Sequence, residues 1–288
     1  MSPHTFVFAV VGDAHVARVN RVLPFLRRYS RAAIVVVTAR TTAPVAHDQV
    51  IAVPTDPALG DRQASVLLKT GLHRVVGPRT GRCCYLDSDV VAVSDRVDAI
   101  FDLAQGPVAF AADHVPMRTL SPWAVRCACA GAPCDHLAEA IRARFGVVVG
   151  EPDWRHWNGG VFVFDAAAWP LLDTWHEYSR AIMAAAEWRT RDQGTLIAAA
   201  WRHGLQDLPL LPRAYNTIVD RLYGVPEARR GAIGAADLHV DRSYSLAPDS
   251  PLPRPHLLHF VNEGVGARGW PNWDEAEALL CPSGDGVL

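Results

Sequence analysis

Alternating apolar strands and amphipathic helices in the first third of the chain limit its fold more than any other feature. Residues 6–11, 34–37 and 50–53 are apolar runs, and such runs are typical of strands buried on both faces of a sheet. Apolar residues recur at helical spacing over 16–26 and 62–76,. This order predicts an α/β fold with a mostly parallel central sheet flanked by helices. Ligands bind such sheets at the carboxyl ends of the strands.

Length and charge narrow the class of protein further. The chain has 288 residues, half of them apolar, and shows no internal repeat or low-complexity linker, so we expect a single domain over residues 1–288. A net charge of -2 argues against nucleic-acid binding through a broad basic surface,. No segment approaches the ~20 apolar residues that span a bilayer, and the N-terminus lacks the charged start of a signal peptide. We therefore expect a soluble cytoplasmic protein.

Two carboxylates follow the apolar run 83–86 in the sequence Tyr-Leu-Asp-Ser-Asp. If that run is a strand, alternation places Asp87 and Asp89 on one face at its end,. Two such close carboxylates stay ionised together only beside a cation or several hydrogen-bond donors. A divalent metal that holds a phosphate-bearing ligand would satisfy them. The alternative from these residues alone is a solvated turn, since Asp is common where strands end.

Two further features concern single residue types. Lys69 is the only lysine among the 28 basic residues, which suggests that a compact ammonium is needed there rather than a guanidinium. A group of cysteines with one histidine, Cys127, Cys129, Cys134 and His136, gives the only hint of zinc. Its spacing matches no common structural zinc pattern, so small residues in a loop are the favoured interpretation and a zinc site is the alternative.

The second half of the chain is predicted with less regularity. Residues 113–155 contain several prolines and glycines, and so long an irregular stretch is typical of a functional loop. Asn158-Gly159-Gly160 is predicted to be a tight turn before a buried strand at 161–164. Asp192 precedes an apolar helix and could simply cap it. His259 lies in a short apolar run near the C-terminus.

Taken in order, these segments resemble the retaining, metal-dependent glycosyltransferases of the glycogenin and lipopolysaccharide-galactosyltransferase type, which have the GT-A fold. The resemblance covers about 250 residues and rests on five motifs in sequence. They are Tyr-Leu-Asp-Ser-Asp at 85–89, Trp-Asn-Gly-Gly-Val at 157–161, Asp-Gln-Gly at 192–194, Leu-Pro followed by Tyr-Asn within 209–216, and His-Phe at 259–260. It implies a nucleotide-binding half at 1–112, an acceptor-side loop region at 113–155, and a sugar and acceptor half at 156–288.

The resemblance also implies a metal site and a donor. Asp89 would bind the metal directly, Asp87 would contact the ribose and share the ion, and His259 would be the third protein ligand. A neutral imidazole suits Mn²⁺ better than Mg²⁺, so Mn²⁺ is expected and Mg²⁺ is the alternative. The donor would be a nucleoside-diphosphate sugar, most simply UDP-linked. The enzyme would be a hexosyl- or N-acetylhexosaminyltransferase that retains the anomeric configuration.

Further residues acquire roles only through this resemblance. Val11, Asp13 and His15 would form the nucleobase site, with His15 replacing a stacking tyrosine. Lys69 would reach the donor. The sugar would lie against Asn158, Gly159 and Gly160, and Asp192 and Gln193 would flank the anomeric carbon. The family's C-terminal lysine, which grips the diphosphate, is missing here, and Arg268 would take its place.

The acceptor remains undefined beyond a small saccharide or natural-product scaffold, and the sequence leaves the oligomeric state open. Trp123, Trp154 and Trp157 are either stacking platforms for the acceptor or core residues.

Three other functions are compatible with parts of the sequence. A phosphatase of the haloacid dehalogenase type would carry its Asp motif after the first strand, and a sugar nucleotidyltransferase would need a glycine- and lysine-rich phosphate loop, which the turn at 12–15 lacks. A non-catalytic nucleotide-sugar binding protein is the third.

Overall fold

The central sheet organises the molecule and places the functional side chains at one edge. The computed structural model describes residues 2–47, 49–151, 153–189, 192–220, 239–240, 243–247, 249–261, 265–266 and 273–280. Within these residues the central sheet has six strands in the order β3-β2-β1-β4-β7-β6. The strands are β1 Thr5–Val11, β2 Ala33–Ala39, β3 Val50–Ala52, β4 Cys83–Leu86, β6 Val108–Ala112 and β7 Trp157–Phe164.

Strand direction confirms the predicted α/β class. Strands β3, β2, β1 and β4 pair in parallel, whereas β7 is antiparallel to both β4 and β6. Helices cover the sheet from both sides. They are α1 Asp13–Tyr29, α2 Asp61–Thr70, α3 Leu72–Val76, α4 Ile100–Leu103, α5 Met117–Ala124, α6 His136–Phe145, α7 Trp169–Ala181, α8 Asp192–Arg202 and α9 Trp273–Leu280, with short 3₁₀ turns at Val97–Ala99, Ala166–Ala168 and Arg213–Tyr215.

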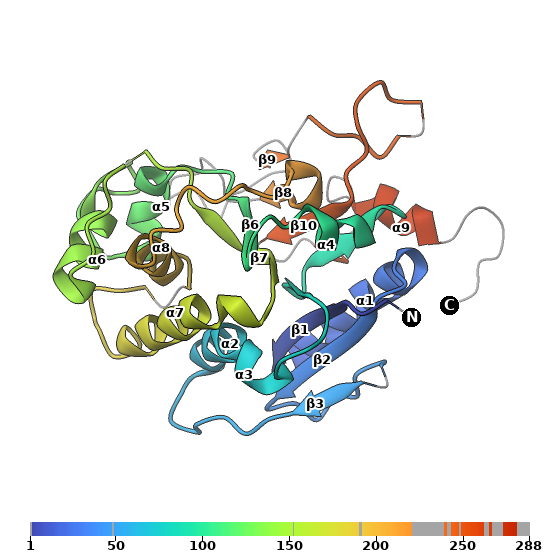
Figure 1. The fold of residues 1–288 in the computed structure, drawn as a ribbon, viewed down its shortest axis with the longest axis horizontal. Helices are drawn as coiled ribbons and strands as arrows, with labels where there is room; N and C mark the ends of the chain where they lie inside the picture. Colours follow the sequence, from blue (N-terminus) through green and yellow to red (C-terminus); the bar gives the residue numbers. More distant parts are fainter. Residues whose placement is uncertain are drawn as a thin grey trace.

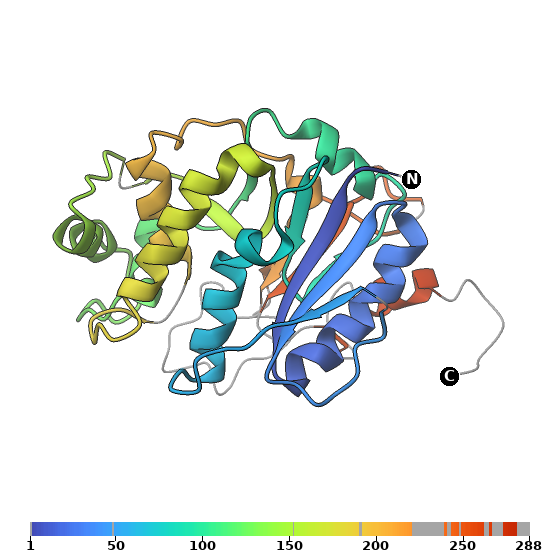
Figure 2. The same ribbon diagram turned by 60° about the horizontal axis from the view of Figure 1, so that its bottom comes forward.

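Side-chain alternation along β1 divides the core between the two faces of the sheet. Val7 and Val11 pack into one cluster with residues of α2, α7 and α8, whereas Phe6 and Phe8 pack into another with residues of α1 and α4. In Figure 2, β1 and β2 run between α1 and α2. Figure 1 shows α5, α6, α7 and α8 gathered beyond β7, with β1, β2 and β3 at the other side. The unbroken apolar strands are thus covered on both faces, as their sequences predict.

A smaller second sheet joins the middle of the chain to its last third. Its order is β5-β10-β8-β9, with β5 at Val90–Ala92, β8 at Thr217–Asp220, β9 at His239–Val240 and β10 at Leu257–Val261. Strand β10 is antiparallel to β5, with His259 opposite Val90. Because β5 begins directly after the Asp-Ser-Asp motif, this pairing carries His259 to the end of β4.

Two expectations from the sequence are wrong. Residues 113–155 are not irregular throughout, because they contain α5 and α6. Pro116 stands at the N-cap of α5 and Pro122 lies inside it, so the prolines do not prevent that helix. Asn158, Gly159 and Gly160 are part of β7 rather than a turn. Strand β6 pairs Phe110 with Phe162 and the next residue with Asn158, so the two glycines lie in a bulge, where glycine is common.

No helix in the described part of the chain combines the length and the apolarity required to cross a bilayer.

Candidate functional site

Two carboxylates and an imidazole converge where β4 ends and β5 begins. Single ligand atoms of Asp87, Asp89 and His259 all lie within 4.8 Å of one another. Nε2 of His259 is 3.4 Å from Oδ1 of Asp89 and 4.0 Å from Oδ2 of Asp87. Oδ1 of Asp89 is buried and accepts no hydrogen bond of ordinary geometry from the described residues. A buried acceptor of this kind, beside a second carboxylate and an imidazole, fits a divalent cation.

Asn216 fixes the orientation of the histidine. Nδ1 of His259 donates to Oδ1 of Asn216 at 2.9 Å, which leaves Nε2 turned toward the carboxylates. Metal-binding histidines commonly use their second nitrogen in this way. Burial alone would lower the pKa of His259, but Asp89 and Asp87 outweigh burial and raise it above its usual value. Conversely, burial would raise the pKa of Asp89, and His259 holds it below its usual value.

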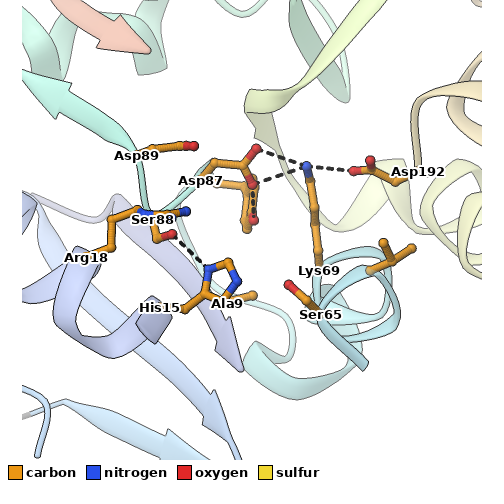
Figure 3. Close-up of a pocket in the computed structure, with 11 residues that line it drawn as sticks. Ala9, His15, Arg18, Ser65, Lys69, Asp87, Ser88, Asp89 and Asp192 are labelled. Carbon is orange, nitrogen blue, oxygen red and sulfur yellow. Dashed lines mark hydrogen bonds and ion pairs between the residues drawn. The ribbon is translucent and has the colours of Figure 1, made fainter. Parts of the chain in front are cut away.

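Lys69 links the carboxylate pair to the N-terminus of α8 (Figure 3). Its Nζ lies 2.7 Å from Oδ2 of Asp192 and 3.2 Å from Oδ1 of Asp87. Only 11% of the lysine side chain is exposed, and burial alone would lower its pKa. The charges of Asp192 and Asp87 outweigh burial and raise the pKa of Lys69 well above its usual value. The ammonium therefore stays charged and neutralises part of the acidic site.

The two glycines of β7 leave room for these side chains. A Cβ on Gly160 would lie 2.3 Å from Cε1 of His259 and 2.9 Å from Oδ2 of Asp87. A Cβ on Gly159 would lie 2.8 Å from Oε1 of Gln193. Contacts below 3 Å are not tolerated by carbon atoms without displacement. The arrangement of Asp87 and His259 consequently depends on the absence of a side chain at Gly160.

Asn158 and Gln193 lie beside this site, but their amide groups form hydrogen bonds within the protein. Nδ2 of Asn158 and Nε2 of Gln193 donate to the same oxygen, Oδ2 of Asp113, at 2.8 and 3.0 Å. Oδ1 of Asn158 accepts from the Gly160 N–H, and Oε1 of Gln193 accepts from the Gly159 N–H, at 2.9 and 2.8 Å. Their contacts are those of residues that hold β7 to the start of α8.

Asp113 joins that scaffold without having been identified from the sequence. Burial alone would raise the pKa of Asp113, but His156, His114 and the Asn158 amide hold it well below its usual value. A single Asp after a strand carries no signal of such a role, because its partners come from distant segments. Its buried negative charge is what both amide side chains bind.

The three residues that were predicted to form the nucleobase site, Val11, Asp13 and His15, lie in different surroundings. His15 lines the cavity, with Nδ1 3.4 Å from Oγ of Ser88. Asp13 instead accepts hydrogen bonds from the loop after β2, including the Thr41 hydroxyl at 2.6 Å and the Thr42 N–H at 2.8 Å. Its pKa is held well below the usual value by these donors, Thr41 foremost. Val11 is buried in the core cluster that includes residues of α2.

Two residues that were not identified from the sequence, Arg18 and Ser65, also line the cavity. Arg18 comes from α1, one turn after His15, and Ser65 comes from α2, one turn before Lys69. The distance of three residues between His15 and Arg18 puts both side chains on one face of α1. Arg18 points toward Ser88 and Asp89 in Figure 3, and adds a guanidinium to this part of the cavity.

The remaining predicted residues either lie away from this cavity or fall outside the residues that the structure describes. Trp157 and Trp154 are buried in the core, where Trp157 stacks on Phe110 with ring centroids 4.7 Å apart. These two tryptophans are therefore core residues rather than exposed platforms. Trp123 is partly buried against the same cluster. Arg268 lies outside the described residues.

Comparisons with known proteins agree with this geometry at the level of the fold. No family model matches the sequence, and no curated protein matches it either. Among solved structures, the bifunctional glycosyltransferase WbbM shares 14% identity at a TM-score of 0.59, over 97% of this chain and 50% of WbbM. The galactosyltransferase LgtC, solved with donor and acceptor sugar analogues, shares 13% identity at a TM-score of 0.54, over 96% of this chain and 95% of LgtC.

Other solved glycosyltransferases also share this fold at low sequence identity. Mouse xyloside xylosyltransferase 1 shares 13% identity at a TM-score of 0.51, over 89% of this chain and 97% of that protein. The glycosyltransferase GlyE of Streptococcus pneumoniae is matched over 60% of its length. This chain therefore spans half to three fifths of the larger proteins, WbbM and GlyE, and nearly all of the smaller ones. The chain has the fold of GT-A-type glycosyltransferases.

Proposed function

We propose that this protein is a metal-dependent glycosyltransferase that moves a sugar from a nucleoside-diphosphate sugar, most simply a UDP-sugar, to an acceptor hydroxyl with retention of configuration. The convergence of Asp87, Asp89 and His259 beside the Lys69–Asp192 ion pair is the observation that carries the proposal. It lies at the end of a central strand, where α/β sheets bind ligands, in a fold shared with solved glycosyltransferases.

The three ligands would hold Mn²⁺, for which their mixed oxygen and nitrogen donors are suited. When bound, a divalent cation neutralises the charge that develops on the departing diphosphate. Lys69 and Arg18, which line the same cavity, add fixed positive charge on the side where phosphates would lie. Asp87 would contact both the ion and the donor ribose.

On the sugar side, Asp192 is the group best placed to act. Its carboxylate is held by Lys69 and lies at the start of α8, against Gly159 of β7. It would hold sugar hydroxyls or act at the anomeric carbon of a hexosyl or N-acetylhexosaminyl donor. Asn158 and Gln193 would position the strand and helix that frame the sugar. The acceptor would be a small saccharide or natural-product hydroxyl.

The position of the Asp motif disfavours the phosphatase alternative. Asp87 follows β4 rather than the first strand, and β1 ends at Val11 before a turn without lysine. The same turn also lacks the phosphate loop that sugar nucleotidyltransfer uses. A binding protein without turnover shares the whole geometry, so it becomes an outcome of the experiment.

A thermal-shift panel of UDP-, GDP- and dTDP-sugars, with and without Mn²⁺, tests the proposal. We expect one nucleotide class to raise the melting temperature only when Mn²⁺ is present, and slow hydrolysis of that donor to be lost in Asp89→Asn. Proton NMR of the released sugar then gives its anomeric configuration. No shift with any donor in the presence of Mn²⁺ contradicts the proposal, and a shift without hydrolysis or transfer indicates a binding protein.

A further inference from the structure

A second group of metal-ligating side chains lies between α5 and α6. The loop after α5 carries Cys127, Cys129 and Cys134, and α6 begins at His136. Single ligand atoms of all four residues lie within 4.8 Å of one another. None of the four lines the cavity that holds Asp87 and Asp89. We refer to these four residues as the thiol cluster.

Distances within the thiol cluster match those of a tetrahedral zinc site. Zinc bonds of about 2.3 Å to sulfur and 2.0 Å to nitrogen, set at tetrahedral angles, separate two sulfurs by about 3.8 Å and a sulfur from a nitrogen by about 3.5 Å. Sγ of Cys127 lies 3.8 Å from Sγ of Cys134. Sγ of Cys129 lies 3.6 Å from Nδ1 of His136. The two pairs share no atom, so their distances are those expected for two opposite edges of a tetrahedron, and the other distances between ligand atoms are all below 4.8 Å.

The surrounding backbone holds the four ligands in place. Ala130 and Gly131 have positive φ angles of 48° and 87°, and the Ala132 N–H donates to the Cys129 carbonyl at 2.8 Å. This tight turn reverses the chain between Cys129 and Cys134. A positive φ is uncommon for alanine, and a compact loop with such a residue is typical of a segment that is fixed by an additional constraint.

A serine next to Cys134 provides an outer contact. Oγ of Ser121, which is fully buried, accepts the Leu137 N–H at 2.9 Å and lies 3.1 Å from Sγ of Cys134. The Cys134 thiol donates to this oxygen. Once Cys134 is a thiolate, the serine hydroxyl would donate its own proton to the sulfur while a lone pair still accepts the Leu137 N–H,. Donors of this kind stabilise zinc-bound thiolates.

We propose that Cys127, Cys129, Cys134 and His136 bind a structural Zn²⁺ ion. Four protein ligands leave no open coordination position, which is typical of structural rather than catalytic zinc. The sequence pattern, Cys-x-Cys and Cys-x-His separated by a short loop, differs from common zinc motifs, but zinc requires the tetrahedron and not a particular spacing. The Cys127–Cys134 sulfur distance is far beyond the ~2.05 Å of a disulfide bond.

The zinc site would stabilise the segment that packs on the start of α8. Leu137, next to His136, and Trp188 lie 3.1 and 3.0 Å from the position of a Cβ on Gly194. The Arg126 N–H donates to the Glu187 carbonyl at 2.7 Å, and the Arg189 N–H to the Ala124 carbonyl at 2.9 Å. Zinc would therefore tie α5 and α6 together where they contact the residues just after Asp192.

Metal content and cobalt substitution of the full-length protein test this inference. We expect protein purified under reducing conditions to contain one zinc per chain, and Co²⁺ replacement to give the intense thiolate-to-cobalt charge-transfer bands of a tetrahedral sulfur site. Those bands require cysteine ligands, so a metal at the carboxylate site cannot produce them. Removal of zinc with a chelator should lower the melting temperature, and added Zn²⁺ should restore it.

Two variants and one control complete the experiment. Cys129→Ser and His136→Ala change half-buried and exposed side chains, so both should fold. Zinc affinity should fall by more than the roughly 10- to 100-fold that loss of an outer contact costs. Asp89→Asn, at the other site, should retain stoichiometric zinc and the cobalt bands. Absence of zinc with no charge-transfer bands, bands of unchanged intensity and position in Cys129→Ser, or a disulfide between Cys127 and Cys134 in the reduced preparation would each overturn the inference.

Discussion

Nζ of Lys69 lies 2.7 Å from Oδ2 of Asp192, and this ion pair connects α2 to the first residue of α8. Because the same ammonium also lies 3.2 Å from Oδ1 of Asp87, one positive charge serves two carboxylates from different parts of the chain. The charge of the site, and not only its shape, thus depends on the single lysine of the sequence.

Lys69→Met should impair both stability and transfer. Removal of the ammonium leaves Asp87 and Asp192 facing each other without compensation, which costs 3–5 kcal/mol for a fully buried pair. Since these carboxylate side chains are 29% and 16% exposed, we expect about 1–3 kcal/mol by urea denaturation. Turnover should fall about 10²-fold, the loss typical of one preorganised charge.

Lys69→Arg is the matched control for that variant. It retains the charge, but its planar guanidinium cannot take the place of a compact ammonium between two carboxylates. We expect most of the stability to return while activity stays low. If Lys69→Met equals the wild type in both measurements, the ion pair has no role.

Asn216→Ala should weaken Mn²⁺ binding without removing a ligand. The asparagine accepts from Nδ1 of His259 at 2.9 Å and so keeps Nε2 toward the carboxylates. Loss of such outer contacts commonly costs 10- to 100-fold in metal affinity. Titration of Mn²⁺ followed by electron paramagnetic resonance measures this affinity. An unchanged affinity would show that the histidine is oriented by packing alone.

Gly160→Ala should displace the metal ligands directly. The new Cβ would lie 2.3 Å from the His259 ring and 2.9 Å from Asp87, and overpacking of this kind typically costs about 1–3 kcal/mol. Mn²⁺-dependent stabilisation should disappear. Gly60→Ala is the control, because its Cβ meets only Gln63, at 3.7 Å. Equal melting behaviour of the two variants with Mn²⁺ would argue against the close approach.

Because of Asp113, the free energy of unfolding of the wild type should decrease as the pH falls through the acidic range. The pKa of Asp113 in the folded protein lies well below the value of about 3.9 in an unfolded chain,. Its contribution is therefore complete above pH ~4 and is lost as the pH falls toward the folded pKa. In Asp113→Asn this part of the pH dependence is absent, because an amide does not titrate.

Urea denaturation at several pH values between 6 and 3 compares the two proteins. At pH 6 the variant should be about 1–3 kcal/mol less stable, since Asn presents an N–H where Asp113 accepts from the Val115 N–H,. The difference should shrink as the pH falls. A constant difference over the whole range would contradict the linkage.

The sequence predicted well the central sheet and the position of Asp87 and Asp89 at a strand end, for a physical reason. Buried parallel strands such as β1 and β2 must be apolar throughout, so their sequences reveal both their type and their place in the middle of the sheet. Asp87 and Asp89 follow directly from β4, so their position at a strand end needs no tertiary information. The proximity of His259 to these two carboxylates could be predicted only from the resemblance to glycosyltransferases.

What the sequence missed depends on contacts between distant segments. Asp113 and Arg18 acquire their places because other elements fold against them, and neither has a local pattern that marks it. The Gly159–Gly160 pair suggested a turn, whereas side chains from α8 and β10 occupy the space beside β7. The helices in 113–155 were hidden by Pro116 and Pro122. The residues of the thiol cluster were noticed, but their spacing did not show that the turn at Ala130 and Gly131 brings them together.

The pairing of β10 with β5 has a consequence for the order in which the protein matures. Strands β1, β2 and β4 can meet while the second half of the chain is still being synthesised, since domains begin to fold from the N-terminal side. His259 reaches Asp89 only when β10 has been added to the small sheet, a contact of very long sequence separation that forms slowly. A nascent chain that ends before residue 257 would hold the carboxylates but lack the imidazole. Capacity to bind a divalent metal at this site would thus arise among the last steps of folding.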